Sequence, residues 1–212
     1  MTCGICSAFE SLDRSEICRD LCAIQASVQF LRARVTVEKI VLMRCGIALG
    51  SNIENRLENL RDGCRRASAL HEPGPPIRAS SIYETSPVDC EPGTASYLNA
   101  VMEINFTGPP VALLDRLLEI EISMGRASKR PRNSPRTIDL DILYAGNLVL
   151  NNSEIIIPHP RIHLRRFVLA PLAEISPDLV LPGYQRAVKS LLAQLNEGGE
   201  VTRLDVPLDV RE

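Results

Sequence analysis

The feature that most constrains the fold is a close alternation of apolar and polar residues from Tyr97 to Phe106. The apolar positions on one side of this segment are Leu98, Ala100, Met102, Ile104 and Phe106. Side chains of a strand point alternately to its two faces, so a period of two is typical of a strand with one apolar face. The chain therefore contains a sheet whose apolar face must be covered.

Two amphipathic helices are predicted to cover that face. The first follows Ser51 and Glu54, which have the spacing of a capping box, and its apolar stripe runs from Ile53 to Ala67. The second begins at Pro109–Pro110 and ends at Gly125, which are residue types typical of the two ends of a helix. Its apolar stripe consists of Leu113, Leu117, Ile120 and Met124.

Three further apolar runs predict strands at Val41–Leu49, Ile77–Thr85 and Thr137–Ala145. The resulting order is strand, helix, two strands, helix, strand. This order is typical of an α+β fold with a ferredoxin-like βαββαβ core, in which both helices lie on one face of an antiparallel sheet. Two polar strand faces are then left exposed together. The other predicted elements are a C-terminal hairpin of Leu148–Leu150 with Ile155–Ile157 and short helices at Phe167–Leu172 and Val188–Leu195.

Composition indicates a globular domain with an N-terminal excess. The 212 residues are 45% hydrophobic and 24% charged, and the formal net charge of -2 argues against a general polyanion binder. No apolar run approaches the roughly 18 residues that a membrane span needs. Four of the seven cysteines lie in the first 22 residues. We therefore expect an N-terminal extension at residues 1–42, helical or partly disordered, and one domain at residues 43–212.

The N-terminal extension has more than one interpretation. Its cysteines, Cys3, Cys6, Cys18 and Cys22, offer four soft ligands for zinc, although no His lies nearby. Alternatively, apolar residues from Ile17 to Leu31 follow helical spacing and predict a helix that docks on a core or a partner. Charged residues interrupt the segment, which argues against export and favours reduced thiols and a cytoplasmic location. A translation start at Met43 would make the segment dispensable.

Asp139 and Asp141 are the strongest candidates for chemistry. They lie two residues apart on a predicted strand, so both side chains leave the same face with Cα atoms roughly 7 Å apart. Two like charges held together need a cation, and Mg²⁺ commonly binds one or two carboxylates together with water and phosphate. Taken alone, the pair also fits a solvated, exposed strand.

Basic residues lie on both sides of this acidic pair. The preceding cluster consists of Arg126, Lys129, Arg130, Arg132 and Arg136, and the following one of His159, Arg161, His163, Arg165 and Arg166. Nucleic-acid binding needs the cations alone, whereas nucleotide chemistry uses both signs, because metal-bound carboxylates hold phosphates and arginines neutralise charge during transfer. Tyr97, on the polar strand face, can stack on a flat heterocycle, while Phe167 alone fits a core position.

In their order along the chain, these residues resemble one family, the 6-hydroxymethyl-7,8-dihydropterin pyrophosphokinases of folate biosynthesis. The matching segments are Ile47–Asn52, Ser80–Thr85, Tyr97–Ala100, Ile120–Glu121, Gly125–Arg126, Pro135–Leu143, Pro158–His159, Arg165 and Phe167. The P-R-x-x-D-L-D element at Pro135–Asp141 is highly specific. Three positions depart from the usual pattern of the family, namely Asn133, Ser134 and Pro160.

The resemblance implies transfer of the terminal pyrophosphoryl group of ATP to the hydroxymethyl oxygen of the pterin, with release of AMP. It implies that Asp139 and Asp141 hold two Mg²⁺ ions and act in catalysis with Arg126 and Arg136. The implied ATP ligands are Glu121, Arg126, Arg136, Ile142, His159 and Arg165. The implied pterin ligands are Thr85, Val88, Tyr97, Asn99 and Phe167. The expected partners are these two small-molecule substrates, without nucleic acid or membrane, and the expected state is a monomer.

An RNA-binding module is the second interpretation of the same elements. A ferredoxin-like sheet with a basic loop is also typical of RNA-recognition domains, which stack bases on aromatic residues of central strands. The strands of this chain offer mainly Tyr83, Tyr97 and Tyr144 for that purpose.

Overall fold

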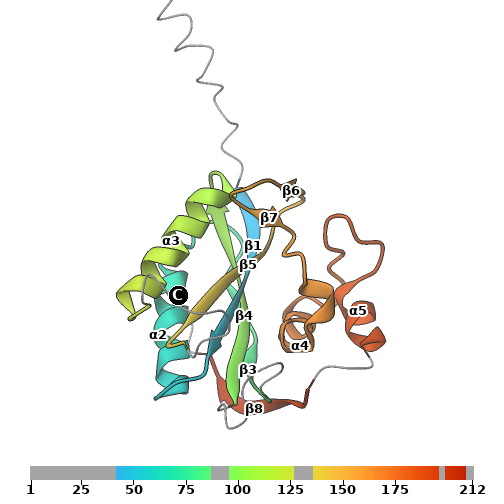
Figure 1. The fold of residues 1–212 in the computed structure, drawn as a ribbon. Coiled ribbons are helices and arrows are strands. Elements are labelled where there is room, and N and C mark those ends of the chain that lie inside the picture. The colour runs from blue at the N-terminus through green and yellow to red at the C-terminus, as the bar shows by residue number, and fades with distance from the viewer. Residues whose placement is uncertain (1–41, 87–95, 127–135, 196–198, 209–212) are drawn as a thin grey trace, which may run out of the picture. The chain divides into compact units, whose positions relative to one another are not determined.

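An antiparallel sheet with strands in the order β5-β1-β4-β3-β8 forms the centre of the fold (Figure 1). The computed structural model describes residues 42–86, 96–126, 136–195 and 199–208. The strands of the sheet are β1 (Leu42–Ser51), β2 (Arg78–Ala79), β3 (Ser81–Thr85), β4 (Tyr97–Thr107), β5 (Asp139–Ala145) and β8 (Val201–Pro207). The short β2 pairs with β4.

Helices α2 (Arg56–Ser68) and α3 (Pro110–Ser123) cover one face of the sheet, on the left in Figure 1. Their predicted apolar stripes and the predicted apolar side of β4 meet in one core, which confirms that both helices lie on the same face. The core includes Leu60, Cys64, Ala67, Leu98, Ala100, Met102, Ile104, Leu113 and Leu117.

The start of α2 differs from the prediction. β1 continues through Ser51, and the helix begins only at Arg56, so Ser51 and Glu54 form no capping box. Asn52 follows β1 directly and contacts a distant segment instead. Its N–H donates to the carbonyl oxygen of Arg136 at 3.2 Å, and its Oδ1 accepts the N–H of Arg136 at 2.7 Å. These two bonds hold the backbone of Arg136 beside the end of β1.

A second apolar layer lies on the other face of the sheet, on the right in Figure 1. It consists of α4 (Arg166–Ile175) and α5 (Val188–Gln194), which confirm the two predicted short helices. α4 is longer than predicted, and α5 ends one residue earlier than predicted. Val168, Leu169 and Leu172 of α4 form a core with Val101, Leu143 and Tyr144 of the sheet. The prediction that the polar strand faces stay exposed together is therefore wrong. Polar residues of β4 are buried there, with Asn99, Glu103 and Asn105 exposed by 7%, 2% and 2%.

A bulge in β5 directs Tyr144 into this second core. Gly46 of β1 pairs with Tyr144 and Ile47 pairs with Ile142, so Leu143 is an extra residue on the β5 side. An extra residue in one strand turns the following side chains to the opposite face. The period of two along the predicted strand Thr137–Ala145 would place Tyr144 on the same face as Ile142, and the bulge is the reason that it lies on the other.

The remaining elements lead from β5 to the edge of the sheet. β6 (Leu150–Asn151) and β7 (Ile156–Ile157) pair as the predicted hairpin, and the 3-10 helix η1 (Ile162–Leu164) precedes α4. β8 pairs with β3 and was not predicted from the sequence. The predicted strand Ile77–Thr85 is divided at Ser80 into β2 and β3. No helix in the described ranges is long and apolar enough to cross a membrane.

Several predictions concern residues outside the described ranges. These are the extension at residues 1–41, Val88, and the basic loop residues with Asn133 and Ser134 at 127–135.

Candidate functional site

A cavity of about 550 Å³ lies where the ends of β1 and β3 meet the starts of β4, β5 and α4. The predicted site residues that line it include acidic, basic, aromatic and uncharged polar side chains. They are Thr85, Tyr97, Asn99, Arg136, Asp139, Asp141, His159, Arg165 and Phe167. The fold therefore brings together residues from β3, β4, β5, α4 and the segments that precede β5 and α4.

Asp139 and Asp141, at the start of β5, both line this cavity, as their two-residue spacing predicted. Each carboxylate is paired with a guanidinium group. Asp139 forms an ion pair with Arg136, and Asp141 lies 3.4 Å from Nη1 of Arg165. The acidic side chains are 29% and 40% exposed, so both remain accessible from the cavity.

Burial and neighbouring charge act in opposite directions on the two arginines. Burial disfavours the charge of Arg136, but the carboxylates of Asp139, Asp141 and Glu121 together outweigh this effect, so the pKa of Arg136 is raised. Burial lowers the pKa of Arg165, and Asp141 offsets only part of that effect. Arg165 also lies over the ring of Phe167, with its guanidinium carbon 5.5 Å from the ring centroid. Arg165 thus contacts both the acidic pair and an aromatic wall of the cavity.

The surroundings of His159 at the cavity favour its neutral imidazole form. Burial, followed by the positive charge of Arg165, lowers the pKa of His159. Its Nδ1 accepts the backbone N–H of Arg161 at 3.2 Å, and the backbone N–H of His159 donates to the carbonyl oxygen of Leu143 at 2.9 Å. With Nδ1 as the acceptor, the neutral ring carries its proton on Nε2, which can donate to a ligand.

Tyr97 and Phe167 line the cavity from the sheet and from the helix that covers it, respectively. Between β3 and β4, Nδ2 of Asn99 donates to the hydroxyl oxygen of Thr85 at 2.7 Å. Aromatic walls with a few fixed polar groups are the usual arrangement for binding a flat heterocycle.

Glu121 lies behind the acidic pair instead of in the cavity. It is 2% exposed, and its Oε1 accepts the N–H of Leu140, the residue between the two aspartates, at 2.8 Å. Its other oxygen pairs with Arg126. Burial raises the pKa of Glu121 to about 7, against the lowering effect of the Leu140 hydrogen bond. Glu121 thus fixes the β5 backbone at the acidic pair and orients Arg126.

Two more predicted ATP ligands do not line the cavity. Arg126 is directed to Glu121, and Ile142 has its side chain in the core on the α2 and α3 side of the sheet.

The structure also adds residues that the sequence did not assign to the site, including Gly50, Ser86, Arg161 and Leu164. Arg161 belongs to the basic cluster that follows Pro158, so the excess of basic residues there was the signal that could have identified it. Among the described residues, no carboxylate forms an ion pair with Arg161, unlike Arg136 and Arg165. At Gly50, a Cβ atom would lie 3.2 Å from Oδ1 of Asn99, so glycine leaves room for this amide.

The sequence model of one family, described as 7,8-dihydro-6-hydroxymethylpterin-pyrophosphokinase (HPPK), matches residues 46–177. The 2-amino-4-hydroxy-6-hydroxymethyldihydropteridine pyrophosphokinase of Haemophilus influenzae is 41% identical over 139 residues, which are 66% of this chain and 85% of that protein. The Bacillus subtilis protein of the same name is 44% identical over 131 residues, which are 61% of this chain and 75% of that protein.

Solved structures of HPPK-DHPS chains have a similar fold. One complex with substrates gives a TM-score of 0.56 at 15% identity, and covers 72% of this chain and 43% of that chain. The Plasmodium falciparum protein with pteroate gives a TM-score of 0.58 at 12% identity, with 74% and 45% covered. This chain thus spans less than half of those chains, and the likeness concerns the fold. By its family match and its bacterial relatives, the chain belongs to the HPPK family, whose members transfer pyrophosphate from ATP to hydroxymethyldihydropterin in folate biosynthesis.

Proposed function

We propose that the cavity binds ATP and 6-hydroxymethyl-7,8-dihydropterin next to each other and that its residues catalyse pyrophosphoryl transfer between them. One observation carries this proposal: the acidic pair, its arginines and the two aromatic residues line a single cavity. A pterin ring needs the aromatic walls, and a triphosphate needs the charged groups. Transfer requires the two substrates to be adjacent.

The acidic pair fits Mg²⁺ by the chemistry of its donors. In the described ranges, no group of three or more His, Cys, Asp or Glu side chains could hold a metal ion. Asp139 and Asp141 would therefore supply only part of the octahedral oxygen shell that Mg²⁺ requires, and phosphate oxygens and water would supply the rest. We propose two such ions, which would neutralise the triphosphate and polarise the attacking hydroxyl group.

The arginines of the cavity would bind the phosphates. Cations on Asp139 and Asp141 would weaken the ion pairs with Arg136 and Arg165, so that both guanidinium groups can turn to phosphate oxygens. Among the described residues no carboxylate pairs with Arg161, so its guanidinium group would bind phosphate without first breaking an ion pair. Nε2 of His159 would donate a hydrogen bond to the same substrate. These donors stabilise the charge that develops on the transferred group and the departing AMP.

The pterin would lie between Tyr97 and Phe167, with Asn99 and Thr85 at its polar edge. Asn99 is held by its hydrogen bond to Thr85, so its carbonyl oxygen has a fixed direction before the substrate binds. Such preorganisation lowers the entropic cost of binding. Arg126, Glu121 and Ile142 remain proposed nucleotide ligands, although their side chains lie outside the cavity.

The wider organisation of the protein is also a proposal. The strand order β5-β1-β4-β3 and the two helices on one face support a ferredoxin-like core, to which β8 adds an edge strand. We propose residues 43–212 as the pyrophosphokinase domain, acting as a monomer in the cytoplasm, with residues 1–42 as a separate extension.

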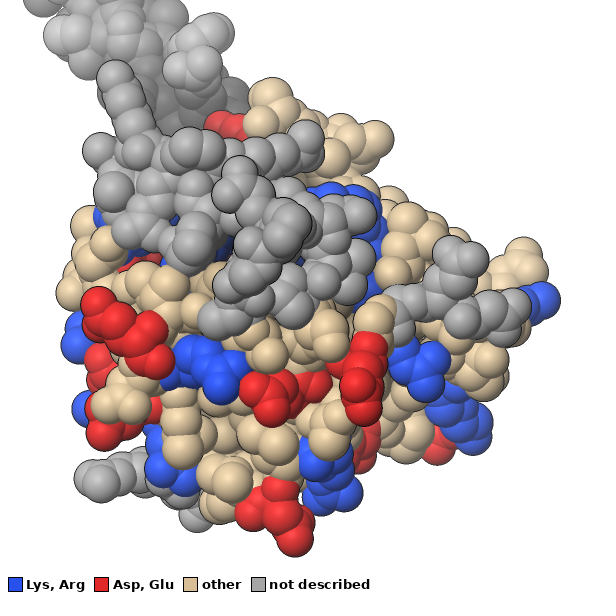
Figure 2. Space-filling view, turned by 60° about the horizontal axis from the view of Figure 1, so that its bottom comes forward, with Lys and Arg blue, Asp and Glu red and all other residues tan. Residues whose placement is uncertain are grey.

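The described structure does not favour the RNA-binding alternative. Tyr83 and Tyr144 are 9% and 2% exposed, so neither offers an open stacking surface. Figure 2, which brings the lower end of Figure 1 forward, shows basic side chains interspersed with acidic ones on the described part of that face.

The direct test is an assay of the purified protein with ATP, Mg²⁺ and the dihydropterin. AMP and the pterin diphosphate are the expected products. Formation of ADP, or no reaction, would contradict the proposal.

A further inference from the structure

Glu174 lies near the C-terminal end of α4, the helix that begins with the cavity residue Phe167 and its neighbour Arg166. Its carboxylate accepts three hydrogen bonds from β3. The donors are the N–H of Ser81 at 3.0 Å, the hydroxyl of Ser81 at 2.8 Å and the hydroxyl of Tyr83 at 3.0 Å. Nη2 of Arg203, on β8, lies 3.4 Å from the Glu174 carboxylate and forms an ion pair with it. One side chain of α4 therefore joins the helix to two strands.

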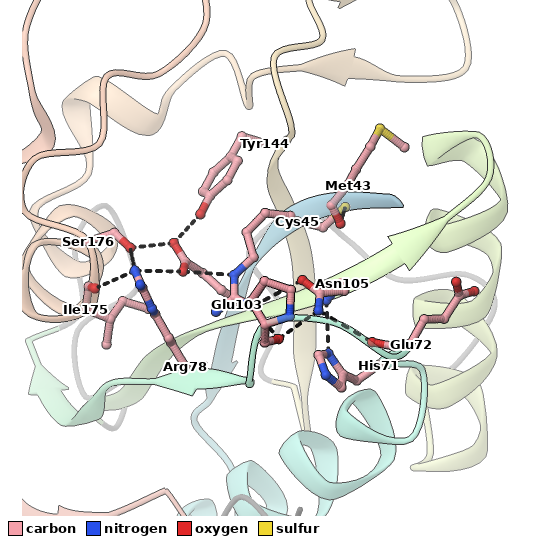
Figure 3. A network of polar contacts seen from close by, with 12 residues as sticks. Met43, Cys45, His71, Glu72, Arg78, Glu103, Asn105, Tyr144, Ile175 and Ser176 are labelled. Atoms are coloured by element: carbon pink, nitrogen blue, oxygen red, sulfur yellow. Dashed lines mark hydrogen bonds and ion pairs between the residues drawn. The ribbon is translucent and has the colours of Figure 1, made fainter. Parts of the chain in front are cut away.

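A second polar contact holds the residue that follows α4. The hydroxyl of Ser176 donates to Glu103 of β4 at 2.7 Å, and Glu103 also accepts from Tyr144 and from Nε of Arg44 at 3.2 Å. Nη1 of Arg78 donates to Oγ of Ser176 at 3.3 Å. Figure 3 shows Ser176, Tyr144 and Arg78 around the carboxylate of Glu103. This contact fixes a point beyond the helix, whereas Glu174 is on the helix itself and limits its tilt about that point.

The two ends of α4 thus have different partners. Phe167 at one end lines the cavity, and Glu174, seven residues later, lies roughly 10 Å along the helix axis. Val168, Leu169 and Leu172 attach the helix to the sheet through apolar contacts, which are not directional. Hydrogen bonds are directional, so the bonds of Glu174 can define the orientation that the apolar contacts leave open.

We propose that Glu174 is a positioning residue for the pterin site. It holds α4 against β3 so that the ring of Phe167 keeps its place in the cavity that Tyr97 also lines. This inference rests on the proposed binding of the pterin between Tyr97 and Phe167. Because Ser176 and the apolar contacts still attach the helix, loss of Glu174 should shift α4 without unfolding the domain.

The test compares steady-state kinetics of Glu174→Ala, Glu174→Gln and a control. Glu174→Ala should raise the KM for the dihydropterin roughly tenfold, since small misplacements in a binding site have large kinetic effects. The KM for ATP should change less. Glu174→Gln should show only a small part of this increase in KM. Its amide oxygen can accept the N–H of Ser81, and its amide nitrogen can donate to the Ser81 hydroxyl. The control is Asp178→Ala, which removes a 79% exposed carboxylate paired with Lys189 and should leave both KM values unchanged.

A purely structural role predicts a different result. If Glu174→Ala lowers the temperature of thermal unfolding but leaves the KM for the pterin unchanged, the inference is wrong. Should Glu174→Ala not fold, Tyr83→Phe replaces it, because this variant removes one hydrogen bond to Glu174. Tyr83→Phe should raise the same KM by a smaller factor, and an unchanged KM would contradict the inference.

Phe167→Ala separates this inference from the function on which it rests. If Phe167→Ala leaves the KM for the pterin unchanged, the proposed pterin site is wrong. If Phe167→Ala raises that KM and the Glu174 variants do not, only the positioning role is wrong.

Discussion

The carboxylate of Asp141 lies 3.4 Å from the guanidinium group of Arg165, which stands just before α4. Asp139 is paired in the same way with Arg136. The acidic and basic groups that a nucleotide with its cations would need are therefore present in one cavity and neutralise each other there. Cations bound to these carboxylates, as proposed above, would free the arginines for phosphate, so metal and phosphate binding should support each other.

Removal of either member of the acidic pair should abolish turnover without loss of the fold. We expect Asp139→Ala and Asp141→Ala to lower kcat at least roughly a thousandfold, since bound metal ions supply several kcal/mol of transition-state stabilisation. Both side chains are partly exposed, so thermal unfolding should change little. AMP release measures the activity, and Asp115→Ala on the exposed side of α3 is the control. Activity near that of the control would remove the metal assignment.

Arg161 should contribute to ATP binding more than a surface arginine does. Arg161→Gln is expected to raise the KM for ATP roughly tenfold with little change in kcat, because it removes a cavity cation that has no carboxylate partner among the described residues. The effect should shrink as salt is added, since ions screen the attraction. Arg186→Gln, at an exposed position, is the matched control. Equal KM values in the two variants would argue against the role of Arg161.

His159 should make the metal-free protein sensitive to acid. Burial and Arg165 lower its pKa from the ordinary value of 6.5, so the unfolded chain binds this proton first as the pH falls. The free energy of unfolding should therefore decrease below about pH 6.5, and this decrease should be smaller in His159→Gln. Denaturant unfolding at several pH values measures the difference. Parallel pH profiles for the two proteins would show that His159 is not the group responsible.

Cys45 should be inert in the folded protein. Its side chain is fully buried, and burial raises the pKa of its thiol to about 12, so almost no thiolate forms at pH 8. Iodoacetamide should modify Cys45 only after unfolding in urea, as followed by peptide mass spectrometry. The equally buried Cys64 should behave in the same way. Rapid modification of Cys45 under native conditions would mean that β1 opens more readily than its packing indicates.

Local periodicity explains which parts of the fold were predictable. The alternation in Tyr97–Phe106 and the stripes of α2 and α3 are properties of short segments, and each predicted face lies in the core. β8 was not predicted because it is an edge strand whose residues are all partly or fully exposed. Its apolar alternation is confined to Leu204 and Val206, which is too short to indicate a strand.

The capping-box prediction failed for a tertiary reason. Ser51 and Glu54 have the required spacing, but Ser51 pairs with Leu98 in the sheet and Asn52 is bonded to Arg136. These contacts hold the segment extended where local propensity favoured a helix start. Long-range pairing outweighs a single cap, which contributes only about 1 kcal/mol.

The sequence by itself determined that Asp139 and Asp141 share a face, because the period of a strand is two. Only the tertiary structure decided which groups meet them there. The packing of α4 on the sheet brings Arg165 to Asp141 and Phe167 to the cavity of Tyr97, and the bulge at Leu143 turns Tyr144 toward Glu103. Such contacts join residues far apart in the chain, so they depend on how the whole core packs and not on any local pattern.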